Sequence, residues 1–137
     1  MGVRHHRELE VWQLCNRVRG RFLELAERAA VRHDFEFRDQ TRQAASSACR
    51  NTAEGFWRFG HAEFAHFVSI AKASLGELMD STDEALQKRY IDDREYKELN
   101  ELLEHALAAA TSLHTHLSTT PTPRRSTDRR KAPDKSS

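Results

Sequence analysis

Glycine, proline and cysteine are all scarce in this 137-residue chain, which contains five, three and two of them. The glycines are not clustered, which excludes both glycine-rich phosphate-binding motifs. Cys15 and Cys49 match no metal-binding or redox spacing, so we expect free thiols packed in a core. No apolar run approaches membrane-spanning length, and the N-terminus lacks the hydrophobic region of a signal peptide. These absences predict a cytoplasmic protein with no membrane partner.

Charge is nearly balanced over the whole chain but is unevenly distributed along it. Residues 1–117 carry 16 Lys or Arg against 19 Asp or Glu, a net charge of −3, whereas residues 118–137 carry six against two, a net charge of +4. A hydrophobic content of 38% is enough for one core. We therefore predict one domain over residues 1–117 and a disordered basic tail over residues 118–137. The tail could serve as an electrostatic arm for phosphates or simply as a solubilising terminus.

Four segments show the periodicity of amphipathic helices. Apolar or small residues recur at steps of three and four, and they predict a first helix over about residues 7–31. Three further stripes run over residues 37–55, 64–85 and 96–117, the first of them built of small side chains that allow close helix approach. Short breaks separate them at His33-Asp34, at Gly60 and at a capping-box-like Asp92 with Glu95. The pattern predicts an all-α, antiparallel, up-down-up-down four-helix bundle.

The bundle lacks the residue patterns of the common catalytic sites. A di-metal carboxylate site needs two Glu-x-x-His motifs, and only Glu63 with His66 fits. The serines inside the predicted helices, Ser46, Ser47 and Ser74, have no glycine elbow and no nearby His-acid pair. We therefore expect no catalytic residue, no metal, no cofactor and no enzymatic activity.

Aromatic residues gather around the break between the second and third helices. Five of the eleven aromatics fall within twelve residues: Phe56, Trp57, Phe59, Phe64 and Phe67. Adjacent residues point about 100° apart on a helix, so Phe56 and Trp57 cannot both face one narrow core stripe. The predicted oligomer interface includes Trp12, Phe56 and Trp57, and a simple aromatic cap on the bundle end is the alternative.

Charged residues near the end of the second helix also stand out. Glu54 opposes the helix dipole there and should have a partner, which is either Arg58 or a residue of another helix or subunit. Arginines recur at multiples of four along the same helix, at Arg38, Arg42, Arg50 and Arg58. This stripe is either an ordinary solvated face or a phosphate-contacting surface. The tail adds four candidate nucleic-acid contacts: Arg124, Arg125, Arg129 and Arg130.

Several motifs follow one another in a distinctive order: Glu8-Leu9-Glu10-Val11-Trp12-Gln13, Gln40-Thr41-Arg42-Gln43-Ala44, Asn51-Thr52-Ala53-Glu54-Gly55-Phe56, Glu63-Phe64-Ala65-His66-Phe67, a run over residues 70–78, and Tyr90-Ile91. In this order they resemble the signatures of one known family, that of the 23S rRNA intervening-sequence proteins. The resemblance covers roughly residues 7–117 and leaves out the tail.

The resemblance implies a four-helix bundle that assembles into a homopentamer and is encoded in some bacteria within inserts of 23S rRNA genes. It also implies a structural role for the motif that contains Asn51, Glu54 and Gly55, and we expect Asn51 and Glu54 to be partly buried and hydrogen-bonded. A related branch of the family, the accessory variability determinant of diversity-generating retroelements, associates with a reverse transcriptase and RNA. An RNA-associated module, a reverse-transcriptase accessory protein and a protein scaffold are therefore the three functional hypotheses.

Overall fold

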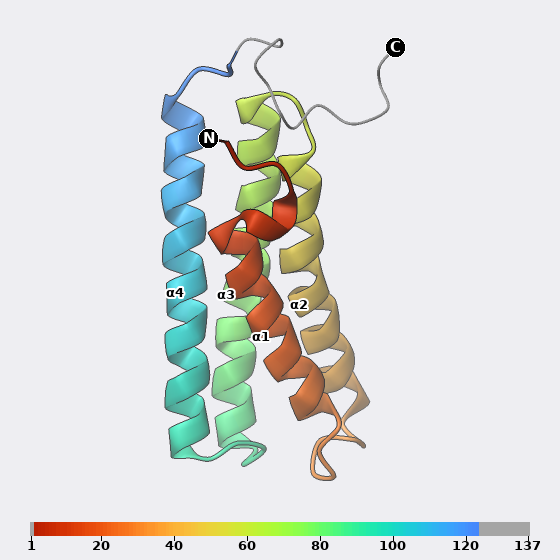
Figure 1. Cartoon of the computed structure of the whole chain (residues 1–137). Coiled ribbons are helices and arrows are strands. Elements are labelled where there is room, and N and C mark those ends of the chain that lie inside the picture. The colour runs from red at the N-terminus through yellow and green to blue at the C-terminus, as the bar shows by residue number, and fades with distance from the viewer. Residues whose placement is uncertain (1, 124–137) are drawn as a thin grey trace.

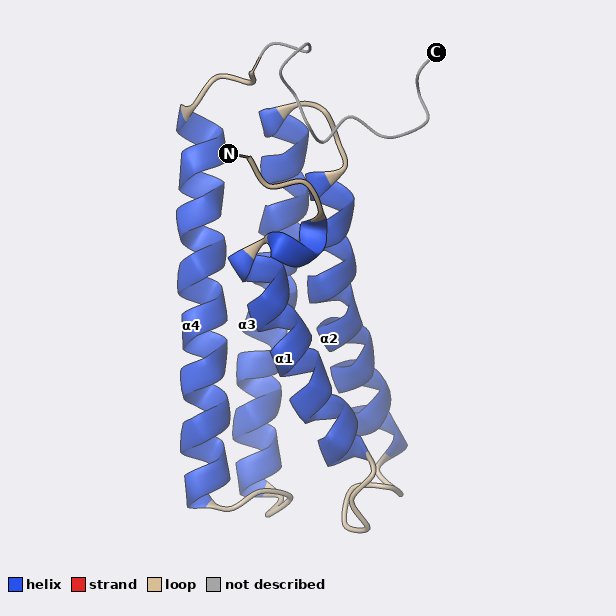
Figure 2. Cartoon of the chain, viewed as in Figure 1, coloured by secondary structure: helices blue, strands red, loops and turns tan. Residues whose placement is uncertain are grey.

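The computed structural model describes residues 2–123, and in that range all of the regular structure is helical (Figures 1 and 2). A short 3₁₀ helix, η1 (His6–Glu8), precedes α1 (Glu10–Ala26), α2 (Phe35–Phe56), α3 (His61–Gln87) and α4 (Asp93–Thr119). Each long helix packs on the next along the chain, and α1 also packs on α4, which closes the bundle. Figure 1 shows the helices running alternately up and down. The predicted antiparallel four-helix bundle is thus confirmed.

The first helix is shorter than the predicted 7–31. Leu9 has an extended backbone, with φ −74° and ψ 131°, and this separates η1 from α1. At the other end the amide of Glu27 donates to the Glu24 carbonyl, a tight turn that closes the helix. The following turn buries Val31 completely, whereas Ala29, which lies inside the predicted helix, is exposed.

Side chains cap two of the four α-helices at their N-termini. The Asp34 carboxylate accepts from the Phe37 amide at 3.2 Å and starts α2. The predicted capping box of α4 is confirmed, because Asp92 accepts from the Glu95 amide while Glu95 accepts from the Asp92 amide.

The core follows the predicted stripes of all four helices. Its largest fully buried side chains include Phe22, Phe37, Phe56, Leu75, Leu78 and Leu103. Three buried threonines, Thr41, Thr52 and Thr82, donate to the carbonyl four residues earlier, so their hydroxyls are satisfied within their own helices. Both cysteines are buried free thiols, and burial raises the pKa of Cys15 to about 12 and of Cys49 to about 11.

Gly55 lets α2 and α3 approach closely, as the small-residue stripe predicts. An added Cβ there would lie 2.8 Å from both Phe64 Cδ1 and Phe67 Cβ. Real Cβ contacts are not that short, so only glycine fits between the two helices at this point.

The described part of the predicted tail is ordered. Helix α4 continues to Thr119, two residues past the predicted boundary. Beyond it, His61 Nδ1 donates to the Thr120 carbonyl and the His61 amide donates to Thr122 Oγ1, both at 2.9 Å. These two bonds tie the chain after α4 to the N-terminus of α3.

Candidate functional site

Two of the four arginines predicted to form a basic stripe are engaged within the fold. Arg38 is only 20% exposed; its Nε donates to the Ala26 carbonyl at 3.1 Å, and its Nη2 lies 3.9 Å from Glu27. It therefore fastens the α1–α2 connection. Arg58 donates twice to Glu54, at 2.7 and 3.0 Å, and stacks over the Phe67 ring. The simpler of the two predicted partners of Glu54 is confirmed.

The four arginines also fail to share one face. Each step of four residues turns an α-helix by about 400°, so successive positions drift by about 40°. Arg38 and Arg50 are therefore about 120° apart, and Arg58 lies beyond the end of α2. The loose stripe predicted from the sequence is therefore spread over more than one face of α2, and its contact with phosphate stays a prediction.

Arg42 and Arg50 remain exposed, and no ion-pair partner is found for either among residues 2–123. They line a shallow depression on the α1–α2 side of the bundle, together with Leu23, Asp39, Gln43 and Ser46. This pair is the part of the predicted basic surface that could contact phosphate. The tail arginines Arg124, Arg125, Arg129 and Arg130 lie outside the described residues.

The Asn51–Gly55 motif is structural, but its two polar members behave differently. Asn51 is partly buried and donates to Ser47, to the carbonyl at 2.9 Å and to Oγ at 3.0 Å. Ser74 of α3 donates to the same Ser47 hydroxyl at 2.8 Å, which links the two helices. Glu54, predicted to be partly buried, has a side chain that is 51% exposed, because its partner Arg58 also reaches solvent.

The aromatic cluster closes the end of the bundle where α2 stops. Phe56 is 1% exposed and belongs to the core, so its assignment to an oligomer interface was wrong. Trp57 is half-buried, and its indole Nε1 donates to His6 Nδ1 at 3.1 Å. The rings of His5 and Trp57, and those of His6 and Trp12, meet edge to face.

The 3₁₀ turn of η1 holds His5 and His6 against Trp57 and Trp12. Burial, followed by the charges of His5 and Arg7, lowers the pKa of His6. Neutral imidazole is also the form that can accept the indole hydrogen bond at Nδ1.

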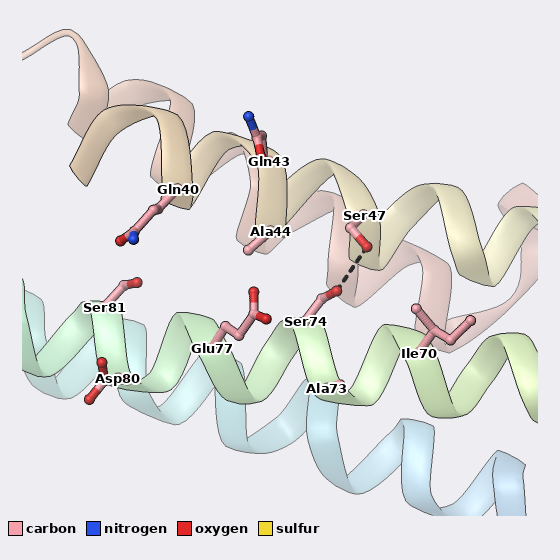
Figure 3. Close-up of a pocket in the computed structure, with 10 residues that line it drawn as sticks. All are labelled: Gln40, Gln43, Ala44, Ser47, Ile70, Ala73, Ser74, Glu77, Asp80 and Ser81. Atoms are coloured by element: carbon pink, nitrogen blue, oxygen red, sulfur yellow. Dashed lines mark hydrogen bonds between the residues drawn. The ribbon is translucent and has the colours of Figure 1, made fainter. Parts of the chain in front are cut away.

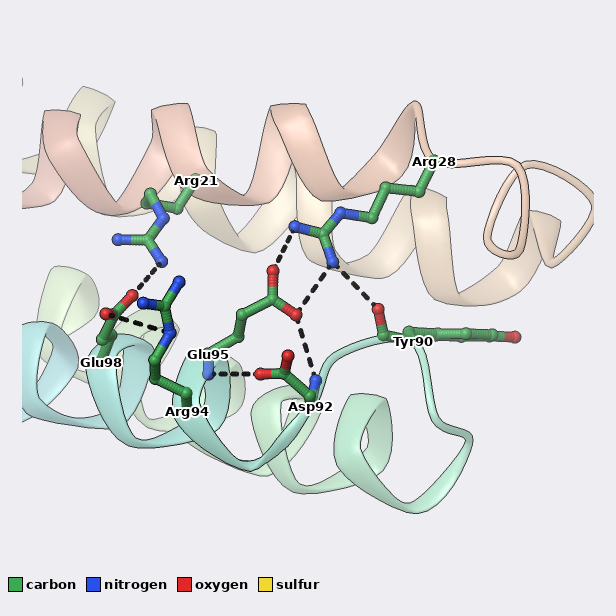
Figure 4. A network of polar contacts seen from close by, with 7 residues as sticks. All are labelled: Arg21, Arg28, Tyr90, Asp92, Arg94, Glu95 and Glu98. Carbon is green, nitrogen blue, oxygen red and sulfur yellow. Dashed lines mark hydrogen bonds and ion pairs between the residues drawn. The ribbon is translucent and has the colours of Figure 1, made fainter.

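An ionic network joins the C-terminal end of α1 and the turn after it to the N-terminal end of α4 (Figure 4). Arg28 contacts both oxygens of Glu95, at 3.2 and 2.6 Å, and donates to the Tyr90 carbonyl at 3.1 Å. The bond to Arg28, and then the Asp92 amide, lower the pKa of Glu95 to about 2. Beside it, Arg21 and Arg94 flank Glu98 at 3.6 and 3.9 Å. Sequence reasoning missed this network because Arg28 and Glu95 are 67 residues apart.

A groove of about 650 Å³ runs between α2 and α3 (Figure 3). Its α2 wall comprises Gln40, Gln43, Ala44 and Ser47, and its α3 wall comprises Ile70, Ala73, Ser74, Glu77, Asp80 and Ser81. Sequence reasoning missed it, although the small residues of the second and third helices are its signal. Within the described range, no group of three or more His, Cys, Asp or Glu side chains could hold a metal ion.

A sequence model of the 23S rRNA-intervening sequence protein family matches residues 7–112 of this chain. The chain belongs to this family. The match begins in η1 and ends within α4, so the membership that the motifs predicted is confirmed over most of the bundle. A search of curated proteins gave no match.

The range matched by the family model includes Arg42, Arg50 and all residues that line the α2–α3 groove. The tail arginines lie beyond it. No helix in the described part of this family member is long and apolar enough to cross a membrane.

Proposed function

We propose that this protein is a non-catalytic, RNA-associated binding module that works as a homo-oligomer, with a homopentamer as the expected assembly. The observation that carries the proposal is membership of a family named for the 23S rRNA intervening sequence. The exposed pair Arg42 and Arg50 supports it, because unpaired guanidinium groups are the natural contacts for a phosphate backbone.

Oligomerisation matters because the body of the chain is slightly acidic and one copy offers few phosphate contacts. Several copies would present the Arg42/Arg50 pair repeatedly, and binding at linked weak sites gains affinity through effective concentration. The fold also leaves apolar surface for assembly: Phe35 is 66% exposed and Leu23 is 45% exposed. The exposed parts of Trp12 and Trp57 extend the proposed contact.

The assembly is tested by light scattering and sedimentation at micromolar concentration. Burying a large aromatic side chain at an interface is worth about 2–3 kcal/mol, so Phe35→Ser and Trp57→Ala should each weaken assembly. Helical content should stay nearly unchanged in both, and Phe35→Ser should disturb folding least because the side chain lies on the surface. A monomer at these concentrations in the unaltered protein would refute the assembly.

RNA binding is tested by titrating structured and single-stranded RNA at two salt concentrations. Arg42→Glu/Arg50→Glu should weaken binding by about tenfold or more and reduce its salt dependence. Arg94→Glu/Lys97→Glu makes the same charge change at exposed positions of α4, which does not touch α2, and should bind nearly normally. A chain ending at Pro123 keeps the His61 contacts and measures the contribution of the tail separately.

No salt-dependent binding by the full chain at tens of micromolar would overturn the RNA role and favour a protein scaffold. Co-purification with a reverse transcriptase would instead support the role of a retroelement accessory protein.

A further inference from the structure

The α2–α3 groove carries negative charge that nothing in the described structure neutralises. Glu77 and Asp80 are exposed, and no ion pair or hydrogen bond involves them within residues 2–123. In Figure 3 the Glu77 side chain projects from α3 toward α2. The lining residues include no Lys or Arg, so the groove presents two carboxylates to its occupant.

The floor of the groove suits an extended backbone. Ala44, Ala73 and the hydrogen-bonded pair Ser47 and Ser74 are small, and Ile70 adds an apolar contact. Because the two serine hydroxyls bond to each other, the floor does not require a particular polar side chain. The groove therefore favours a positively charged segment with a thin, extended backbone.

A basic segment of the same chain follows residues that are anchored at the start of α3. Thr120 and Thr122 are fixed to His61, the first residue of α3, and α3 forms one wall of the groove. The residues that follow include five cationic side chains between positions 124 and 131, with one aspartate among them. The basic segment thus starts at one end of the helix that carries both carboxylates.

The lengths agree as well as the charges. At about 1.5 Å per residue along α3, Glu77 lies about 24 Å from His61 and Asp80 about 28 Å. An extended chain spans about 3.3 Å per residue, so Arg129 can reach about 23 Å from Thr122 and Lys131 about 30 Å. Residues 129–131 can therefore lie beside the two carboxylates without loosening the anchor at His61.

We propose that residues 124–131 dock along the α2–α3 groove of the same chain, with the basic residues at 129–131 facing Glu77 and Asp80. The tail then acts as a self-docking arm that a competing polyanion must displace. The docking itself does not rest on the RNA-binding proposal.

The test compares backbone amide NMR spectra of the full chain and of a chain ending at Pro123. At low salt, removal of the tail should shift the amides of residues 43–47 and 73–81, and high salt should abolish most of the difference because exposed charges are screened. In the Glu77→Gln/Asp80→Asn variant the shifts should fall by more than half. The Glu101→Gln/Glu104→Gln variant, altered at exposed positions of α4, should retain them.

Two results would overturn the proposal. Identical groove signals with and without the tail would show that the segment does not dock there. Shifts of the groove signals in a labelled chain ending at Pro123 when unlabelled full chain is added would assign the groove to the tail of a second copy, because docking within one chain needs no second molecule. Neither readout uses RNA, so a failure of RNA binding and a failure of docking remain distinguishable.

Discussion

Replacing Gly55 with alanine would test how tightly α2 and α3 must pack. The new Cβ would lie 2.8 Å from Phe64 Cδ1 and Phe67 Cβ, and 3.2 Å from the Phe64 carbonyl oxygen. The Phe64 ring can turn away, but Phe67 Cβ and the carbonyl are attached directly to the α3 backbone, so the helices must separate. Overpacking of this kind costs about 1–3 kcal/mol.

Alanine also has the higher helix propensity, which by itself stabilises a helix by about 0.5–1 kcal/mol. Gly76→Ala isolates that gain, because Gly76 is exposed on α3 and an added Cβ meets nothing within 4 Å. We expect Gly76→Ala to raise stability by this amount. The free energy of unfolding of Gly55→Ala should be lower than that of Gly76→Ala by the overpacking cost alone, about 1–3 kcal/mol.

Urea and thermal unfolding followed by circular dichroism would measure the difference. For a domain of this size 1 kcal/mol corresponds to about 3–6 °C in Tm, so the two variants should be clearly separated. If Gly55→Ala raises Tm as much as Gly76→Ala does, the close approach of α2 and α3 does not constrain the sequence and the reasoning is refuted.

Two further predictions concern pH. The pKa of His6 is lowered from 6.5 in the fold, so its contact with Trp57 is at full strength above that pH and is lost as the pH falls. Tryptophan fluorescence should therefore change as the pH falls below 6.5, and His6→Gln should abolish that change; an unaltered profile would contradict this assignment. The pKa of Glu95 falls from 4.5 to about 2, so the stability supplied by its pairing with Arg28 is complete above pH 4.5 and declines toward pH 2. Acid unfolding of Glu95→Gln should show a smaller loss over this window, and a loss equal to that of the unaltered protein would contradict the pairing.

Local signals in the sequence were enough to predict the elements. Steps of three and four fix which face of a helix is apolar, and Asp92 with Glu95 satisfies backbone groups only three residues away. The stripe of small residues over 37–55 likewise indicated a closely packed helix face. These features depend on neighbours along the chain, so they can be read without knowing the fold.

The sequence did not predict the surroundings of residues whose partners are far away along the chain. Arg38 looked like Arg42 in sequence, but the turn after α1 brings the Ala26 carbonyl to its guanidinium and leaves the side chain only 20% exposed. Phe56 looked like Trp57, but the helix rotation places one ring in the core and leaves the other at its edge. The sequence pattern could not show which member of each pair is buried, because it does not show which side chain contacts another part of the fold.

The sequence by itself determined the four helices, their order and the family, because each follows from spacing and from motifs within one segment. Tertiary structure alone decided which charges remain available for a partner. Arg28 pairs with Glu95 across 67 residues and Trp57 bonds His6 across 51, whereas Arg42, Arg50, Glu77 and Asp80 stay unpaired in the described range. Pairs such as Arg28 with Glu95 and Trp57 with His6 depend on groups that folding brings within hydrogen-bond distance from distant parts of the chain.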